Sequence, residues 1–436
     1  MRALGAYAVW AALAVAALAI VRAQRRRPAA WQPPAIATVA AASVMAFAIV
    51  SWGRATPLGD FNKAYYPAGA MILSDPSRLY ECDVSNLCFV NLPLVALLFT
   101  PLTMMARLPA QLLFTAIGAV AVAAAAWLTI RELDARGADR SAIVAAFALN
   151  GPLLYSIRLG NLTHVLLPCL AIAIVSLAGG REARAGVLFA VLTVIKPPFL
   201  LFLPYLVLRR RTIAAVAFAA TVTLIVTASM ALFGTELHKL WLATFIGPFA
   251  ARPVAAYNVQ SISGLVAHFT MPGHLTDWTP LEAPAMFNAA RYVLVLAVTA
   301  IAAIALFARG APRDATAHRL ELNCVLVLML LASPLTWSHY YAFVVPALAA
   351  YASRRTPVLG AWWMIVPLAA MLVSLPVVLP LLSAPIPAAL IERVLISHYT
   401  WGGILLLGCL CASRLAAPRG HRTSTHDPSS RELPHR

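Results

Sequence analysis

The feature that most constrains the fold of this chain is a series of long apolar runs spread over its whole length. A helix needs about 20 apolar residues to cross a lipid bilayer. Runs of roughly that length lie near 4–22, 35–52, 109–130, 141–157, 162–178, 185–208, 212–233, 289–308, 320–335, 340–352, 357–382 and 398–416. Lys196-Pro197-Pro198 interrupts the run at 185–208, so we expect two short helices there. The pattern predicts an all-α, polytopic integral membrane protein with about 12–13 transmembrane helices.

Composition excludes a string of soluble domains. The chain is 61% hydrophobic and only 11% charged, whereas a soluble domain carries about 25% charged residues. The first run, residues 3–21, is followed rather than preceded by basic residues, from Arg22 to Arg27. A secretory signal peptide has the opposite arrangement. We therefore interpret this run as a membrane helix whose amino terminus lies outside.

Basic residues orient the predicted helices. Lys and Arg concentrate in the short cytoplasmic loops of membrane proteins. Here 22 of the 33 basic residues fall on one side of the predicted topology. They lie in 22–27, 131–140, 181–184, 209–211, 309–319, 354–355 and from 414 onward. This orientation explains the net charge of +17, and no basic soluble domain is predicted that would bind nucleic acid.

Two long segments, 53–108 and 234–288, face the outside in this topology. Residues 92–102 are apolar but too few to span, so we expect a juxtamembrane helix on the outer surface beside another at 61–73. The inner face has short loops and a polar tail, 417–436, whose composition predicts disorder. Chemistry is therefore expected on the outer face.

The six cysteines form two groups. Four lie in predicted membrane helices as small apolar fillers: Cys169, Cys324, Cys409 and Cys411. Cys82 and Cys88 lie in the outer loop, where an oxidising compartment permits a disulfide. The spacing leaves the bonded and the reduced states open; a bond would place the two Cα atoms about 4.4–6.8 Å apart. Two cysteines without a nearby histidine do not make a four-ligand metal site.

Acidic residues are scarce, with 16 Asp and Glu in all, so their positions are informative. Asp60 stands just beyond an apolar run, in Gly59-Asp60-Phe61-Asn62-Lys63-Ala64-Tyr65-Tyr66. Asp is a favoured N-cap. Asp60 therefore either caps the helix that begins at Phe61 or belongs to a site at the outer membrane surface.

Lys196 lies inside one apolar run, and His339 lies between two others. An ionisable residue inside a membrane segment is costly and usually faces a polar cavity or a ligand. Lys196 is such a residue and suits a phosphate, and the alternative is that its ammonium reaches the membrane surface. His339 lies in Ser333-Pro334-Leu335-Thr336-Trp337-Ser338-His339-Tyr340-Tyr341, where a helix breaks at the outer face. A lone histidine there is often a hydrogen-bonded structural residue.

Two polar motifs, Arg158-Leu159-Gly160-Asn161 and Asn258-Val259-Gln260-Ser261, are each typical of loops. The predicted topology nevertheless brings polar residues from distant parts of the chain to one face: Asp60, Lys196, Asn258, Gln260 and His339. Such a set suits group transfer from an anionic lipid-linked donor, because a base can deprotonate an acceptor hydroxyl and a cation can stabilise a leaving phosphate. Nucleotide sugars are not supplied outside the cytoplasm, so a sugar donor there would be carried on a polyprenyl phosphate.

These motifs resemble glycosyltransferase family 87 over about residues 35 to 415. The pieces that carry the resemblance are Asp60-Phe61 through Tyr65-Tyr66, Leu79-Tyr80, Phe89-Val90-Asn91-Leu92-Pro93 to Pro101-Leu102, Leu159-Gly160-Asn161, Ile195-Lys196-Pro197, Asn258-Val259-Gln260-Ser261 and Ser333 to His339. The chain departs from the family in having Gly160-Asn161 where Gly-Gln is frequent, and Val90-Asn91-Leu92-Pro93 where Tyr-Pro-Pro is frequent.

The resemblance implies a GT-C fold at residues 31–416, an extra N-terminal helix at 1–30 and a cytoplasmic tail at 417–436. It implies an enzyme of the cell membrane that moves a mannose-like hexose from a polyprenyl-phosphate donor to a lipid or glycan acceptor, with no metal or cofactor. Asp60 would be the catalytic base and His339 a second active-site residue. The substrate-binding residues would be Lys196, Asn161, Asn258, Gln260, Tyr65 and Tyr66.

Two other functions stay open from the sequence. A secondary transporter would place polar groups at mid-membrane and often shows repeated halves, but no internal repeat is visible in this chain. A non-catalytic membrane scaffold would make Asp60 dispensable.

The topology can be tested by cysteine accessibility. In a background that lacks Cys82 and Cys88, single cysteines within 53–108 and 234–288 should react with a membrane-impermeant thiol reagent on intact cells. A cysteine at Arg210 should react only after permeabilisation, because positively charged loops stay in the cytoplasm. Labelling at Arg210 on intact cells would overturn the orientation and the outer location of the site.

Overall fold

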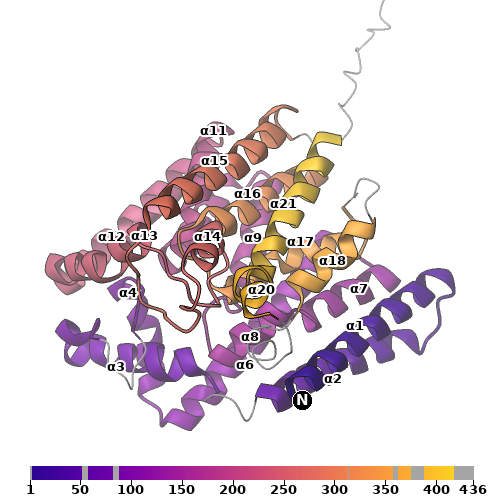
Figure 1. Cartoon of the computed structure of the whole chain (residues 1–436), viewed down its shortest axis with the longest axis horizontal. Coiled ribbons are helices and arrows are strands. Elements are labelled where there is room, and N and C mark those ends of the chain that lie inside the picture. Colours follow the sequence, from indigo (N-terminus) through magenta and orange to yellow (C-terminus); the bar gives the residue numbers. More distant parts are fainter. Residues whose placement is uncertain are drawn as a thin grey trace, which may run out of the picture.

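The computed structural model describes residues 2–51, 57–81, 88–312, 314–356, 362–374 and 387–416. Within these ranges the protein is almost entirely helical and forms no β-strand, so the predicted all-α class is confirmed. The helices pack into one bundle (Figure 1). In chain order they are α1 (Arg2–Arg26), α2 (Gln32–Ser51), η1 (Phe61–Tyr65), α3 (Tyr66–Ser74), η2 (Pro76–Arg78), α4 (Pro93–Ala96), η3 (Leu97–Phe99), α5 (Thr100–Thr103), α6 (Arg107–Glu132), α7 (Gly137–Ala148), α8 (Gly151–Leu159), α9 (Leu167–Ala178), α10 (Glu182–Ile195), η4 (Pro197–Leu201), α11 (Phe202–Leu208), α12 (Thr212–Trp241), η5 (Leu242–Ile246), α13 (Gly247–Ala251), α14 (Ile262–Thr270), α15 (Ala285–Phe307), α16 (Ala315–Ala332), η6 (Ser338–Val344), α17 (Val345–Ala352), α18 (Trp362–Leu372), α20 (Ala388–Arg393), η7 (Leu395–Ser397) and α21 (His398–Ala416).

Seven helical segments in the described ranges are long and apolar enough to cross a membrane. They are Ala8–Arg26, Gln32–Ile49, Arg107–Glu132, Thr212–Ala251, Ala285–Phe307, Ala315–Ala332 and Ala388–Ala416. The bent pair of α7 and α8, at 46°, makes up to eight. The protein is therefore a polytopic membrane protein, as predicted. The predicted count of 12–13 is higher because apolar runs also form shorter helices, such as α9 and Pro197–Leu208, and composition does not distinguish these from spans.

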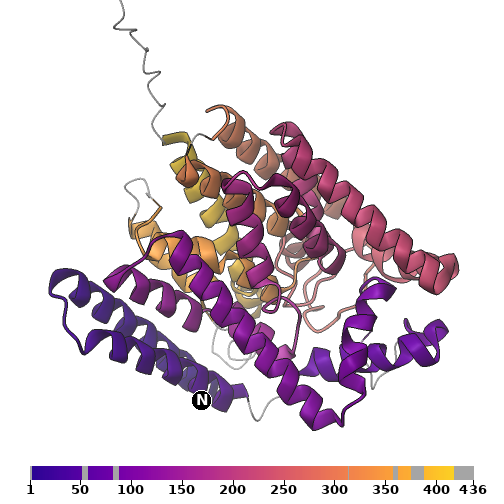
Figure 2. The ribbon, with the colours of Figure 1, turned by 180° about the vertical axis from the view of Figure 1, so that it is seen from behind.

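The two N-terminal helices form a hairpin on one flank of the bundle. Figure 1 shows α1 and α2 side by side along α7, while α12 and α13 lie on the opposite flank, and the view from behind in Figure 2 agrees. The indole of Trp10 in α1 donates to the backbone carbonyl of Val373 at 3.3 Å. The N-terminal helix α1 thereby contacts a distant part of the chain.

Three of the loops that carry basic clusters lie together. Arg25 donates to the backbone carbonyl of Ala352 at 2.7 Å and reaches the carboxylate of Asp139 at 3.4 Å. Arg355 binds the same carboxylate at 3.1 Å. The loops that follow α1, precede α7 and follow α17 therefore meet. The side of the membrane that these loops face stays a prediction.

A second, buried ion cluster joins three helical regions. Glu321 in α16 is fully buried, and its carboxylate accepts hydrogen bonds from Nε of Arg209 and Nε of Arg414, both at 2.9 Å. The hydroxyl of Tyr205 donates to it at 3.1 Å. Breaking a buried ion pair is expensive because it leaves a charge uncompensated. This cluster connects α11, α16 and α21.

Two helices, α10 and α16, end at breaks in the chain that lie near the candidate site. Lys196 ends α10 with extended dihedrals, φ −134° and ψ 89°, because Pro197 follows and disfavours a helical residue before it. Pro334 likewise follows the end of α16. The α10 helix begins at Glu182, which pairs with Arg211 at the arginine-rich end at 3.0 Å. At 1.5 Å per residue, Lys196 lies about 20 Å from that end.

Replacing Glu321 with Ala should lower the free energy of unfolding by about 3–5 kcal/mol, because two buried guanidinium groups lose their counter-charge. The measurement is thermal or denaturant unfolding of the purified protein in detergent. Glu236→Ala is the matched control. It removes an exposed partner of Lys239, with side chains 82% and 70% exposed, and should cost at most about 1 kcal/mol. Equal losses in both variants would contradict a structural role for the buried cluster.

Candidate active site

Segments far apart in the sequence meet where these helices break. Asp60 precedes η1, Asn161 follows α8, Lys196 separates α10 from η4, and Tyr340 lies in η6. Gly160 makes the approach of the first two possible. It has φ of +66°, and a Cβ atom there would lie 2.8 Å from Cβ of Phe61. Glycine fits both demands because it lacks a Cβ atom.

The side-chain amide of Asn161 is the centre of the resulting network. Its Nδ2 donates to Oδ2 of Asp60 at 2.7 Å and to the hydroxyl of Tyr65 at 3.3 Å. Its Oδ1 accepts from Nζ of Lys196 at 3.1 Å and from the hydroxyl of Thr163 at 2.9 Å. One buried amide thus joins a carboxylate and an ammonium that lie 136 residues apart in the sequence.

The structure contradicts the helix-cap interpretation of Asp60. Its backbone is itself helical, with φ −65° and ψ −41°, and its side chain makes no capping hydrogen bond. The carboxylate instead accepts the Asn161 amide. Burial raises the pKa of Asp60 above its ordinary value, while the Asn161 hydrogen bond and the Lys196 charge act in the opposite direction. A carboxylate with a raised pKa is a better proton acceptor than an exposed one.

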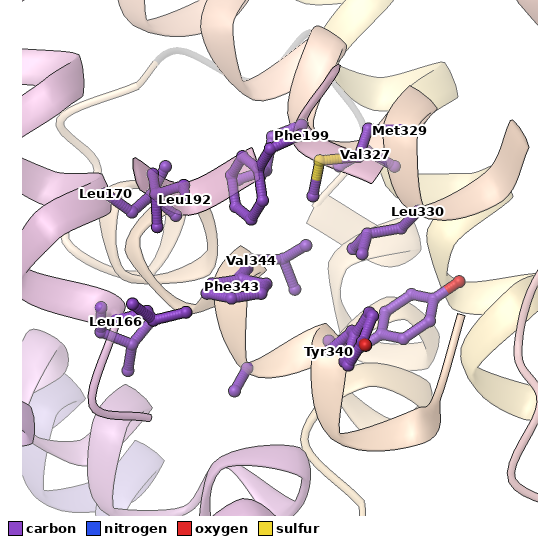
Figure 3. Close-up of a cluster of buried hydrophobic side chains, with 14 of the residues drawn as sticks. Leu166, Leu170, Leu192, Phe199, Val327, Met329, Leu330, Tyr340, Phe343 and Val344 are labelled. Carbon is purple, nitrogen blue, oxygen red and sulfur yellow. The ribbon is translucent and has the colours of Figure 1, made fainter. Parts of the chain in front are cut away.

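Lys196 is buried rather than extended to the membrane surface, which removes that alternative. It is 3% exposed, and its Nζ lies 3.4 Å from the hydroxyl of Tyr340 and 4.5 Å from the centre of that ring. Figure 3 shows Tyr340 at the edge of an apolar cluster that includes Phe199, Phe343 and Leu330. The tyrosine ring that the ammonium contacts therefore belongs to a packed, apolar cluster.

His339 lies beside this network. It is 4% exposed, and no described residue forms a hydrogen bond with either of its ring nitrogens. Its ring contacts Tyr340 at 5.0 Å and Tyr155 at 6.4 Å between centroids. Buried polar groups normally have partners. The alternative of a hydrogen-bonded structural histidine is therefore not observed, and both buried nitrogens lack a partner among the described residues.

The structure does not bring every predicted residue to Asp60. Tyr66 turns away and donates to the backbone carbonyl of Met105 at 2.9 Å. Asn258 accepts from the indole of Trp278 at 3.0 Å. Their roles as substrate-binding residues stay predictions, and neither side chain contacts the Asn161 network.

The side chain of Gln260 is bound by the backbone of the protein and does not reach Asp60. It is 1% exposed, and its amide donates to the backbone carbonyls of Tyr257 and Ile396, both at 2.8 Å. Its motif nonetheless supports the site, because an isolated bridge pairs Val259 with Trp337, two residues before His339. The motif fixes the backbone that carries His339.

Sequence reasoning passed over Thr163 and Tyr340. Both stand next to singled-out motifs, Thr163 two residues after Asn161 and Tyr340 directly after His339. The feature of the sequence that could have identified them is a polar side chain within two residues of a predicted site residue. The residue types alone do not show that both side chains reach the same network.

The structure tests part of the prediction for Cys82 and Cys88. Cys88 is disulfide-bonded. Its expected partner, Cys82, lies outside the described residues, as does the predicted tail at 417–436. The remaining cysteines are free, as predicted: Cys169, Cys324, Cys409 and Cys411.

The helical membrane fold and a family comparison together define a membrane glycosyltransferase. Residues 89–334, more than half of the chain, match glycosyltransferase family 87. The protein belongs to this family, which confirms the resemblance seen in the sequence. Asn161 and Lys196 lie inside the matched residues, and Asp60 and His339 lie outside them. No curated protein matches the sequence.

Because Asp60 makes no cap, Asp60→Asn should leave stability nearly unchanged. Its side-chain oxygen can still accept the Asn161 amide, so the unfolding free energy should change by less than about 1 kcal/mol. Asp314→Ala is the comparison. Asp314 caps α16 by accepting from the amide of Ala317 at 2.7 Å, and losing a cap typically costs about 1 kcal/mol. Thermal unfolding in detergent measures both, and a larger loss for Asp60→Asn would restore a structural role.

Proposed function

We propose that the protein transfers a hexose, mannose-like in class, from a polyprenyl-phosphate donor to a lipid or glycan acceptor on the outer face of the cell membrane. The observation that carries this proposal is the joining of the Asp60 carboxylate and the Lys196 ammonium through one buried amide. A base and a cation are the two charges that transfer from a glycosyl phosphate requires.

Asp60 is the base in this proposal. The acceptor hydroxyl oxygen attacks the anomeric carbon while Oδ1 of Asp60 takes its proton. No described residue forms a hydrogen bond with that oxygen atom. The bond between the anomeric carbon and the phosphate oxygen breaks, and the polyprenyl phosphate leaves with the electron pair. A single displacement of this kind inverts the anomeric configuration.

Lys196 and His339 bind the donor in this proposal. A buried ammonium is worth far more to a phosphate than an exposed one, because water does not screen it. Lys196 has no carboxylate within ion-pair distance among the described residues, so its charge is left to act on a ligand. The unpartnered nitrogens of His339 supply a donor and an acceptor for the phosphate or for sugar hydroxyls.

The outer location is supported by the distance between the site and the arginine-rich end. Arg211 binds Glu182 at the opposite end of α10, and arginine-rich loops face the cytoplasm in most membrane proteins. A transporter would place its polar groups near mid-membrane on broken helices. We retain residues 31–416 as the catalytic unit, since Asp60, Asn161, Lys196 and His339 all come from it.

The test is transfer of a labelled hexose from a polyprenyl phosphate by the purified protein. Asp60→Asn keeps the shape but removes the base, so the rate should fall about 10²–10⁴-fold, the usual contribution of general-base catalysis. Asp75→Asn is the control, because Asp75 is an exposed acid of the same predicted outer segment and its carboxylate accepts from the hydroxyl of Ser77. It should transfer at the wild-type rate.

Two outcomes would contradict the proposal. Wild-type transfer by Asp60→Asn would remove Asp60 as the base. Failure of the wild-type protein with every polyprenyl-phosphate hexose, in the presence of membrane lipid and glycan acceptors, would remove the donor class.

A further inference from the structure

The amide of Asn161 has no hydrogen-bonding capacity left for a substrate. A side-chain amide has two N–H donors and two acceptor lone pairs. Both donors are used, by Asp60 and by Tyr65. The oxygen accepts from Lys196, from the hydroxyl of Thr163 at 2.9 Å and from the Thr163 amide at 3.0 Å. The residue is 5% exposed, so little of its surface is open to a ligand.

The chemistry of its neighbours also fixes which end of the amide faces which group. An ammonium and a backbone N–H can only donate, so the oxygen must face Lys196 and Thr163. An ionised carboxylate can only accept, so the nitrogen must face Asp60. The opposite orientation of the amide would leave donor against donor and acceptor against acceptor. The arrangement therefore favours a charged Asp60 and a charged Lys196 together.

Backbone hydrogen bonds at the end of α8 fix the position of the Asn161 side chain. The backbone N–H of Asn161 donates to the backbone carbonyl of Ser156 at 3.0 Å, and the backbone N–H of Gly160 donates to the backbone carbonyl of Ile157 at 3.0 Å. This is the pattern of a Schellman motif, in which glycine adopts the left-handed conformation after a helix. Asn161 is the residue that follows this glycine, so the end of α8 sets the direction of its side chain.

We propose that Asn161 is a positioning residue, which holds the Asp60 base and the Lys196 cation at the two ends of one amide and does not itself contact substrate. The inference rests on the proposed function and changes the role that the sequence predicted for Asn161. A direct ion pair would place the ammonium on the carboxylate and occupy the oxygen that must take a proton. The intervening amide keeps the two charges near each other and leaves Oδ1 of Asp60 open.

A consequence of this placement is a dependence on pH. The Asn161 hydrogen bond lowers the pKa of Asp60, which burial raises. The base works only when ionised, so transfer is lost as pH falls through the pKa of Asp60. Removing the amide should raise this pKa and move the acid limb of the rate profile to higher pH. The other groups that face Asp60 are Lys196 and the phenols of Tyr65, Tyr155 and Tyr340, with His339 beside Tyr340.

The experiment is a pH profile of transfer by Asn161→Leu, whose side chain has a similar volume and no polar atoms. We expect kcat to fall at least tenfold at neutral pH with little change in the KM for the donor. The acid limb should move upward by on the order of one pH unit, the usual effect of one hydrogen bond to a charged group. A raised KM with an unmoved limb would show that Asn161 contacts substrate and would overturn the inference.

A second pair of variants keeps the inference testable if Asn161→Leu does not fold. Thr163→Val removes one donor to Oδ1 of Asn161 and should move the acid limb in the same direction by a smaller amount. Thr163→Ser keeps the hydroxyl and should restore the wild-type limb. Identical limbs in these two variants would count against the positioning role.

The proposed function and the positioning role of Asn161 would fail in different ways. If the wild-type protein transfers no hexose from any polyprenyl phosphate, the proposed function is wrong; if Asp60→Asn transfers sugar at the wild-type rate, Asp60 is not the base and the positioning role of Asn161 is lost with it. If Asp60→Asn is inactive while Asn161→Leu matches the wild type in kcat and in pH profile, the function stands and only the positioning role is lost.

Discussion

Inside a bilayer there is no water to pair with a polar group, so every buried donor, acceptor and charge must find its partner within the protein. This constraint explains where the polar side chains of the chain are found. They gather where prolines and Gly160 interrupt the helices, since those breaks free backbone and side chains to meet across elements. Asn161 shows the constraint most fully, because its one amide accommodates a carboxylate, an ammonium, a phenol and a hydroxyl.

The two buried ionic clusters of the protein differ in a way that separates structure from chemistry. Around Glu321, two guanidinium groups and a phenol donate to a single carboxylate, and both of its oxygens are occupied by groups of the protein. Around Asn161, the acid and the cation are held apart by a neutral amide, and His339 beside them has no partner among the described residues. A saturated cluster stabilises the fold, whereas an unsaturated one can act on a substrate.

Several residues of the candidate site could be chosen from the sequence because their surroundings were unusual. Asp60 and Lys196 were conspicuous as charges next to apolar runs, and His339 as a polar residue after a proline break. Gln260 met the same criterion but packs against backbone carbonyls, because a polar residue in an apolar chain is as often a structural link as a ligand contact. Composition cannot separate these cases, since both satisfy the same demand for a partner.

The sequence by itself determined the helical membrane class, the family and the positions of the chain breaks. These depend on local properties, namely the length of apolar runs, the fixed dihedral angle of proline and the order of short motifs. Only the tertiary structure decided that Asp60 is no helix cap, that Lys196 is buried, and that Asn161 lies between them. Those facts depend on how α8, α10 and η1 approach one another in space. No single stretch of sequence encodes a contact between residues more than a hundred positions apart.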